Sequence, residues 1–508
     1  MDLLTPLPAV ADEGRSIAQL VPDPRTNFGQ NVRIEPGPVV TPTTEPEVLA
    51  AMRRYRACRI RVLGSLHSWS EAAAPDDVAF DLRHFNQIES LAAGPNGVAY
   101  VEVGAGCTVE RLLDYLHVNG RYTLPVYGVI GKQTVAGAIS TGTHGSGRSS
   151  MSHYVTGISA AVYDEKGNPI VQHWTGGDRL EAARCGLGCT GVILSVRLQV
   201  EPDFQIEERI EWFDRLDPLL AEALAYPRSQ FYLMPWTWRW YAQLRRQVVP
   251  EAARSPGIFA RVLRVFRLVV VDILLNGAIK YLAATPRRRR HLPWLFQRVV
   301  PLLAPSGVRV TDDSRRLLTV RHDLFTHVEC EIFVPAANLS AAATLVEWAL
   351  RCCGGEETPP GTDAVVQRFG TALVAEIDPL RGEHVHDYPI TFRRVLRDDT
   401  LISMTSGDTE EWYAISLITY RPDLTAFLRL MRLLSKIMAR TLGGRPHWGK
   451  LCLLQTEEVA ALYPRMSQFR AHCASIDPAQ TFVNDYARLN VGFNPGDRKP
   501  PRPQASRG

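Results

Sequence analysis

Short apolar runs alternate with amphipathic segments along the first two fifths of the chain. Alternation of apolar and polar positions predicts strands at 60–63, 78–82, 99–103 and 192–200. Apolar residues at helical spacing predict helices at 45–55 and 109–117, each with an acidic first turn. Because strands and helices are mixed, the pattern predicts an α+β fold.

The pattern changes after residue 203, which suggests a domain boundary. A chain of 508 residues is too long for one ordinary core, since about 150 residues per domain is typical. We expect four units: a Pro-rich N-terminal arm at 1–32, a first domain at 33–203, a second domain at 204–495 and a flexible tail at 496–508.

Residues 254–298 combine an apolar run with strong positive charge. The segment contains ten Lys or Arg residues and one acidic residue, Asp272. The run 268–284 contains three polar residues, and a spanning helix needs about 20 mostly uncharged ones, so a transmembrane helix is not expected. Two interpretations stay open. The segment packs on the protein with a solvated basic face, which we favour, or it lies on an anionic membrane surface.

Composition narrows the class of protein. The net charge of +4 is too small for nucleic acid to be the default partner. The nine cysteines form no CxxC pair, and the histidines show no metal-ligand spacing, so neither a disulfide framework nor a metal site is expected. The N-terminus lacks the features of a secretion signal. We therefore expect a reduced, cytoplasmic protein.

Glycine-rich loops carry the chemical signal. Gly186 to Gly191 match GxGxxG, but a helix precedes them and a strand follows, the reverse of a dinucleotide-binding turn. Loops 64–70 and 137–147 gather Gly, Ser and Thr around single histidines. Such loops let backbone N–H groups and hydroxyls approach a pyrophosphate closely. The chain has no Gly-Lys-Ser/Thr, which excludes a P-loop NTPase.

These motifs occur in the order and spacing of vanillyl-alcohol-oxidase-type FAD proteins. The sequence Arg-Pro-His-Trp-Gly-Lys at 445–450 resembles the signature of the aldonolactone oxidase branch, which includes gulonolactone, arabinonolactone and alditol oxidases. The resemblance covers 33–203 and 320–495. It implies a two-domain FAD-binding (PCMH-type) fold, in which a second domain built on an antiparallel sheet caps the flavin and shapes the substrate site.

The resemblance also implies the site residues. His67 would carry the flavin covalently, as its counterpart does in many relatives, and Lys450, Arg393 and His447 would act at the reacting end. The FAD-binding positions would be Gly64, Ser65, Leu66, His67, Ser68, Gly106, Ser140, Thr141, Gly142, His144, Gly145, Ser146, Gly191 and Val192.

Two positions depart from the family pattern. Leu66 stands where relatives usually have Gly, and Thr391 stands where relatives place the Glu of a Glu-x-Arg pair that ends at Arg393. A Thr hydroxyl hydrogen-bonds but cannot act as a carboxylate base. Other acids could substitute, and the candidates are Glu329, Glu331 and Glu383.

The implied activity is FAD-dependent oxidation of a CH–OH group in a sugar-derived lactone, polyol or related alcohol, as in D-arabinono-1,4-lactone oxidase. A hydride would pass to flavin N5, and the acceptor would be oxygen, a quinone or a cytochrome. Two alternatives stay open. One is a membrane-surface FAD dehydrogenase, peripheral at the inner face, that acts on a lipid-linked sugar or donates to quinone. The other is a flavin-binding protein without turnover. The His-Trp-Gly-Lys element argues against an NADPH-dependent reductase of the same fold.

Overall fold

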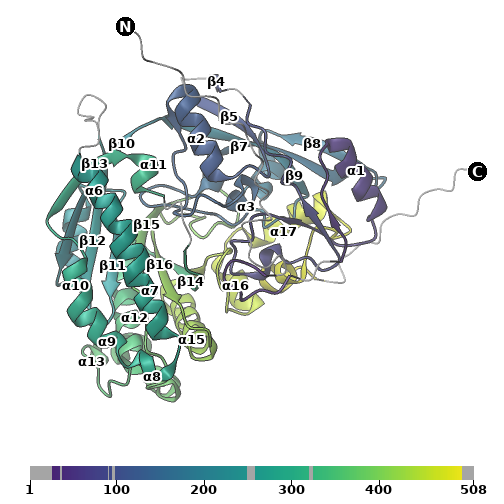
Figure 1. The fold of residues 1–508 in the computed structure, drawn as a ribbon. Helices are drawn as coiled ribbons and strands as arrows, with labels where there is room; N and C mark the ends of the chain where they lie inside the picture. Colours follow the sequence, from purple (N-terminus) through teal and green to yellow (C-terminus); the bar gives the residue numbers. More distant parts are fainter. Residues whose placement is uncertain are drawn as a thin grey trace, which may run out of the picture.

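A computed structural model describes residues 26–34, 37–89, 91–93, 98–248, 258–319 and 324–494. The first domain contains two sheets (Figure 1). One is parallel, in the order β1 (Val39–Val40), β3 (Val78–Asp81) and β2 (Ile60–Leu63). The other is antiparallel and contains β4 (Ala92–Ala93), β5 (Ala99–Gly104), β9 (Val192–Pro202), β7 (Val155–Tyr163) and β8 (Pro169–Trp174), with β6 (Tyr122–Thr123) beside β9.

The strands and helices predicted for this domain are confirmed. α1 (Glu45–Arg54) and α2 (Val109–Gly120) are capped by Thr44 and Thr108, whose side chains accept hydrogen bonds from first-turn N–H groups. α4 (Gly177–Ala183) precedes β9, so the Gly186–Gly191 motif is a turn from helix to strand, as its context predicted.

The second domain is built on an eight-stranded antiparallel sheet. The order of its strands is β13 (Val308–Asp313), β10 (Gln205–Phe213), β12 (Arg239–Val248), β11 (Gln230–Met234), β15 (Ile390–Leu396), β16 (Glu411–Thr419), β14 (Val328–Pro335) and β17 (Arg445–Pro446). β9 leads directly into β10, so the two domains are joined by a very short connection. The α+β fold class and the antiparallel cap domain are thus confirmed.

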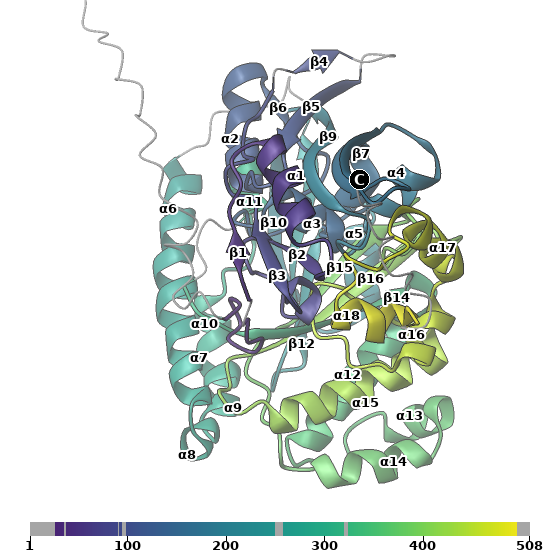
Figure 2. The same ribbon diagram turned by 90° about the vertical axis from the view of Figure 1, so that its right-hand side faces the viewer.

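Helices cover both faces of this sheet (Figure 2). On β11, Phe231 and Leu233 pack in the core with α12 (Leu339–Cys353) and α15 (Thr425–Leu442), while Met234 faces the opposite side. A helical layer covers that side, made of α6 (Ile258–Phe266), the π-helical stretch η6 (Arg267–Leu275), α7 (Asn276–Ala283), α8 (Pro286–Arg289), α9 (Leu292–Trp294), η7 (Leu295–Val299) and α10 (Val300–Leu303). Met234 shares a core with η6, α7, α9, η7 and α10, whereas α6 packs on Val310 of β13.

This layer contains most of the basic apolar segment at 254–298. No helix among the described residues is long and apolar enough to cross a bilayer. The segment packs on the sheet, as the favoured interpretation expected, but Arg289 is buried and two further arginines pair with acids of the sheet. Arg264 pairs with Asp312 of β13, and Arg267 pairs with the fully buried Glu208 of β10. The expected solvated basic face is therefore smaller than the sequence suggested.

The C-terminal segment returns to the first domain. The backbone N–H of Ile60 donates to the carbonyl of Thr481, and Asn484 Nδ2 donates to carbonyls of 71, 72 and 74. This segment also contains α16 (Thr456–Leu462), α17 (Met466–Ile476) and α18 (Asp485–Ala487). Since these contacts are distant in sequence, the first domain is completed by the end of the chain.

Candidate functional site

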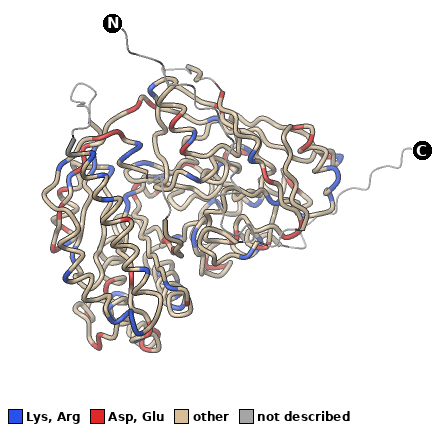
Figure 3. Tube along the Cα trace, in the orientation of Figure 1, with Lys and Arg blue, Asp and Glu red and all other residues tan. Residues whose placement is uncertain are grey.

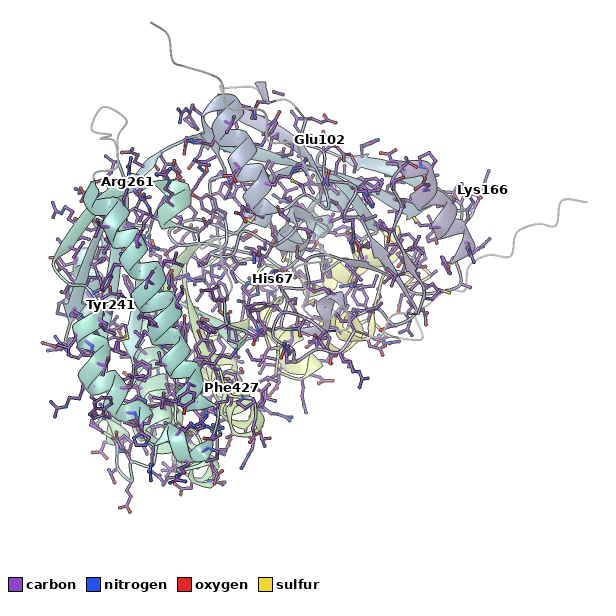
Figure 4. All side chains as sticks on the ribbon, in the orientation of Figure 1. His67, Glu102, Lys166, Tyr241, Arg261 and Phe427 are labelled. Atoms are coloured by element: carbon purple, nitrogen blue, oxygen red, sulfur yellow. The ribbon has the colours of Figure 1, made fainter. Side chains whose placement is uncertain are left out.

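A large cavity lies between the two domains. Its volume is about 910 Å³, near the upper end of the range for small-molecule sites. Its walls come from the Gly-rich loops of the first domain, the inner face of the second-domain sheet and the helical layer. Figure 4 labels His67 near the middle of the molecule, where these parts meet.

The first glycine loop is fastened to the loop that carries Lys450. The N–H of Trp69 donates to the carbonyl of Gly449 at 2.9 Å, and Ser68 Oγ donates to the same carbonyl at 3.1 Å. Ser70 Oγ donates to the carbonyl of Trp448 at 2.6 Å. Lys450 Nζ lies 3.9 Å from the Trp69 ring centroid. Two segments separated by almost 400 residues therefore form one side of the cavity.

Leu66 adopts the backbone conformation that favours glycine. Its φ is +56°, in the left-handed region that costs a Cβ-bearing residue about 1 kcal/mol. Its carbonyl accepts a hydrogen bond from the N–H of Phe28 at 2.8 Å. The phenyl ring of Phe28 stacks on His67 with centroids 5.2 Å apart. Leu66 thus holds a glycine-like turn in this loop, with Phe28 of the N-terminal segment packed against it.

Asn27 holds this segment on the loop. Its side chain is buried, donates to the carbonyl of Ser68 at 2.7 Å and accepts from the N–H groups of Asn31 and Val32. Asn27→Ala is therefore expected to lower the free energy of unfolding by about 1–3 kcal/mol, because several buried polar groups lose their partners. Chemical denaturation measures this change. Asn119→Ala, at an exposed position, is the control. Equal stability of the two variants would contradict a stabilising role of the Asn27 hydrogen bonds.

Two features of the cavity wall are suited to binding FAD, the hydroxyl of Ser65 and the turn at Gly106. Ser65 Oγ is buried, lines the cavity and makes no hydrogen bond to any described residue. A buried hydroxyl without a partner is costly, and a pyrophosphate oxygen would supply one. Gly106 lines the same region, and a Cβ there would lie 2.1 Å from the carbonyl oxygen of Leu82. Only glycine permits the backbone at 106 to pass so close to the backbone of Leu82.

The predicted binding residues separate into two groups. Ten line the cavity, namely Gly64, Ser65, Leu66, His67, Ser68, Gly106, Ser140, Thr141, His144 and Gly191, as do Lys450, Arg393 and His447. Four lie behind its wall, namely Gly142, Gly145, Ser146 and Val192. Val192 is fully buried in β9, and Ser146 donates to the carbonyl of Ser229. Ser146 therefore joins the second loop to the cap domain.

Glu331 lies at the centre of a buried charged cluster. Its Oε2 is 3.4 Å from His144 Nε2 and 3.9 Å from His447 Nε2, and its Oε1 is 3.9 Å from a guanidinium nitrogen of Arg393. Burial would raise the pKa of Glu331, but the charge and hydrogen bond of His144 outweigh it and hold that pKa below its usual range. Burial lowers the pKa of His447 to about 3, so this imidazole is neutral.

Hydrogen bonds locate the protons in this cluster. His144 Nδ1 faces the carbonyl of Gly145 at 3.0 Å, and a carbonyl only accepts, so Nδ1 carries a hydrogen. Its Nε2 faces the carboxylate of Glu331, and that contact also requires a proton. His447 differs, since its Nδ1 accepts from the N–H of Gly449.

A second acid pairs with Lys450. Glu329 Oε2 contacts Lys450 Nζ, and Oε1 accepts from Ser416 Oγ. Thr391 lies on the same sheet, opposite Ser416 of β16, which in turn is opposite Glu331 of β14. Glu331 therefore lies level with Thr391 on the same sheet, two strands away. Of the three substitute acids considered, Glu329 and Glu331 line the cavity and Glu383 does not.

The partners of Glu329 and Glu331 could not be predicted from the sequence, although the strand pattern indicated that both acids are paired. Glu329 and Glu331 are two apart in a strand whose other members are apolar, so both project from one face of the sheet. Acids in such a strand are buried only when they are paired. Gln230 was missed altogether, and its Oε1 accepts from Arg393 Nε at 3.2 Å.

Comparisons with known proteins agree with this site. The family model described as D-arabinono-1,4-lactone oxidase matches residues 196–490, and the FAD binding domain model matches 36–170. A long-chain alcohol oxidase from an uncultured marine euryarchaeote is 40% identical over 478 residues, covering 93% of this chain and 98% of that protein. An L-gulono-1,4-lactone dehydrogenase from Mycobacterium tuberculosis is 25% identical over 465 residues, with coverages of 90% and 96%.

A solved structure of cholesterol oxidase from Brevibacterium sterolicum shares the fold, with a TM-score of 0.67 at 15% identity, covering 92% of this chain and 96% of that one. Fold, cavity and family matches lead to the same conclusion. The chain belongs to the D-arabinono-1,4-lactone oxidase family, within the aldonolactone oxidase branch of the vanillyl-alcohol-oxidase-type flavoproteins, and it is an FAD-dependent oxidoreductase that acts on CH–OH donors.

Proposed function

We propose that the enzyme oxidises the hydroxyl-bearing carbon of an alcohol with a long apolar chain, in place of the sugar-derived substrate implied by the resemblance. The supporting observation is the chemistry of the cavity wall away from the flavin loops. Its apolar members come from the helical layer, the facing sheet and the loop before β14, namely Met234, Leu268, Val271, Leu275, Ile279, Phe296, Val300, Leu324, Phe325 and Ile418. A sugar lactone would leave most of this surface without a partner.

The reacting end of the cavity is polar. Lys450 and Arg393 supply positive charge near the site of the substrate oxygen, and Glu329 lies in contact with Lys450. Bound FAD supplies a two-electron acceptor at N5 for the hydride that leaves the carbon. Glu329 accepts the hydroxyl proton, and the ammonium of Lys450 stabilises the oxygen as its O–H bond weakens.

Glu331 serves a different purpose in this proposal. It balances the charge of His144 and Arg393, and it contacts the loop of Lys450, since the carbonyl of Glu331 accepts from the N–H of His447 at 3.0 Å. Carboxylates are thus present despite Thr391, which removes the reason for expecting a flavin-binding protein without turnover. The covalent attachment of flavin to His67 stays a prediction.

The name of the relative at 40% identity, a long-chain alcohol oxidase, supports the same substrate class. The test is a homologous series of primary alcohols from butanol to dodecanol, compared with L-gulono-1,4-lactone and a sugar polyol. We call the part of the cavity lined by the apolar side chains given above the apolar chamber. We expect kcat/KM to rise up to about fourfold per methylene until the alcohol chain fills this chamber, because each buried methylene contributes about 0.8 kcal/mol. The highest kcat/KM on the lactone, with no dependence on chain length, would contradict the proposal.

A matched pair of variants tests whether the dependence of kcat/KM on chain length comes from the apolar chamber. Val271→Trp places a large ring at the chamber wall, whereas Val269→Trp places it on the exposed side of the same helix. Val271→Trp should lower kcat/KM for decanol more than for butanol, because the longer chain needs the filled volume. Val269→Trp should leave both values unchanged.

A further inference from the structure

The helical run from α6 to α7 exposes a continuous apolar stripe. Val262, Val265, Val269 and Ile273 follow one another at spacings of three and four residues, and their exposed fractions range from 42% to 61%. Leu274 and Tyr281 extend the stripe towards α8, and both are about as exposed. We name these six residues the outer face. Figure 1 shows this run in front of the second-domain sheet, and Figure 2 shows it along the left-hand side of the molecule.

The opposite side of the same run is fully used. Leu275 and Ile279 are buried in the core against the sheet and line the cavity. Arg264 and Arg267 form the inward ion pairs with Asp312 and Glu208. The run is therefore already anchored on its inner side, so the fold does not need the outer face for packing. An apolar face of this length is unusual on a surface exposed to water.

Cations flank the outer face at both ends. Arg261 lies at its start, and Arg287, Arg288 and Arg290 follow its end, where the guanidinium of Arg288 lies 4.1 Å from the Tyr281 ring centroid. Neither Arg261 nor Arg287 forms an ion pair with a carboxylate among the described residues. From 258 to 298 the chain carries nine Lys or Arg and one acid. Figure 3 shows Lys and Arg gathering at the α8 end of this run.

We propose that the outer face docks on the surface of a lipid bilayer that contains anionic headgroups. An apolar stripe flanked by arginines matches both layers of such an interface, since the stripe enters the acyl boundary and the guanidinium groups contact phosphates. A second copy of this chain offers no such match, because two copies of the outer face would bring arginine clusters of the same sign together without acids to meet them.

Docking also bears on substrate delivery, and this consequence rests on the proposed function. The helices whose outer side carries the stripe form the wall of the apolar chamber with their inner side. A long-chain alcohol dissolved in the bilayer would then lie close to the chamber. The docking itself depends only on the outer face and the arginines, so it can be tested without any substrate.

The experiment is flotation of the full-length, flavin-loaded protein with vesicles of phosphatidylcholine, with and without phosphatidylglycerol. We expect binding to the anionic vesicles that weakens with added salt. Replacing Arg287, Arg288 and Arg290 together by Gln should lower the partition coefficient by about 10²-fold. Replacing Val265 and Ile273 together by Ser should lower it by a similar factor.

Matched controls use exposed residues of the same types elsewhere. Arg53→Gln with Arg54→Gln on α1 tests for nonspecific charge, and Val118→Ser with Leu224→Ser tests for nonspecific apolar contact. Neither pair should change binding. Absence of flotation, or equal losses in the controls, would overturn the proposal. A dimer in solution that the Val265/Ile273 variant dissociates, without vesicle binding, would assign the face to a second copy. Hexanol turnover by the same preparations is measured separately, so failure of docking and failure of alcohol oxidation remain distinguishable.

Discussion

Glu329→Gln is expected to lower the rate of substrate-dependent flavin reduction by about 10²–10⁴-fold, the usual contribution of a positioned general base. Glutamine keeps the size of the side chain and its hydrogen bond with Ser416, but it cannot accept the hydroxyl proton. Rapid mixing with decanol under anaerobic conditions measures this rate directly. A variant that reduces its flavin at the normal rate would exclude Glu329 as the proton acceptor.

Lys450→Met tests whether the pair acts as a unit. The loss of its ammonium should lower the same rate by about 10²–10³-fold, the typical effect of removing one preorganised charge. Because Glu329 and Lys450 contact each other, the double variant should be far less impaired than the product of the two losses. Lys166→Met is the control, since Lys166 is exposed and lies far from the cavity (Figure 4). Full additivity would show that the two side chains act separately.

Glu331→Gln is expected to cause the largest loss of stability, about 3–5 kcal/mol in the free energy of unfolding. The substitution removes the carboxylate charge that lies 3.4 Å from His144 and 3.9 Å from the guanidinium of Arg393, so the guanidinium loses a counter-charge. Chemical denaturation of the flavin-loaded protein, followed by tryptophan fluorescence, measures the change.

The matched control for this prediction is Glu411→Gln, which breaks a partly exposed pair with Arg394. Exposed pairs contribute about 1 kcal/mol or less, so this variant should remain close to the parent protein. If both variants lost the same small amount, the charged arrangement around Glu331 would not be a stabilising one.

Local sequence patterns determined much of the first domain. Strands such as β3 and β5 and the capped helices α1 and α2 were predicted because alternation, helical spacing and cap residues are read within a few positions. The loop at 64–70 could also be located from its composition. Its shape could not, because Leu66 has a left-handed φ and the loop is bonded to distant parts of the chain, Leu66 to Phe28 and Trp69 to Gly449.

The ion-pair partners of the charged residues could not be predicted from the sequence. Arg264 and Arg267 have the spacing of a solvated face, yet both are turned inward by acids on strands that fold beside them. The link between His144 and Glu331 likewise depends on how the two domains meet. Such pairs are set by tertiary structure, whereas spacing along the chain only limits which residues share a face.

The most direct measurement follows the visible absorbance of the purified flavoprotein during anaerobic addition of one alcohol or one lactone. We expect the flavin band to be lost on addition of decanol and to persist on addition of L-gulono-1,4-lactone. Loss of the band with the lactone, together with an unchanged spectrum in decanol, would contradict an apolar alcohol as substrate. A colourless protein that takes up no added FAD would contradict the cavity as a flavin site.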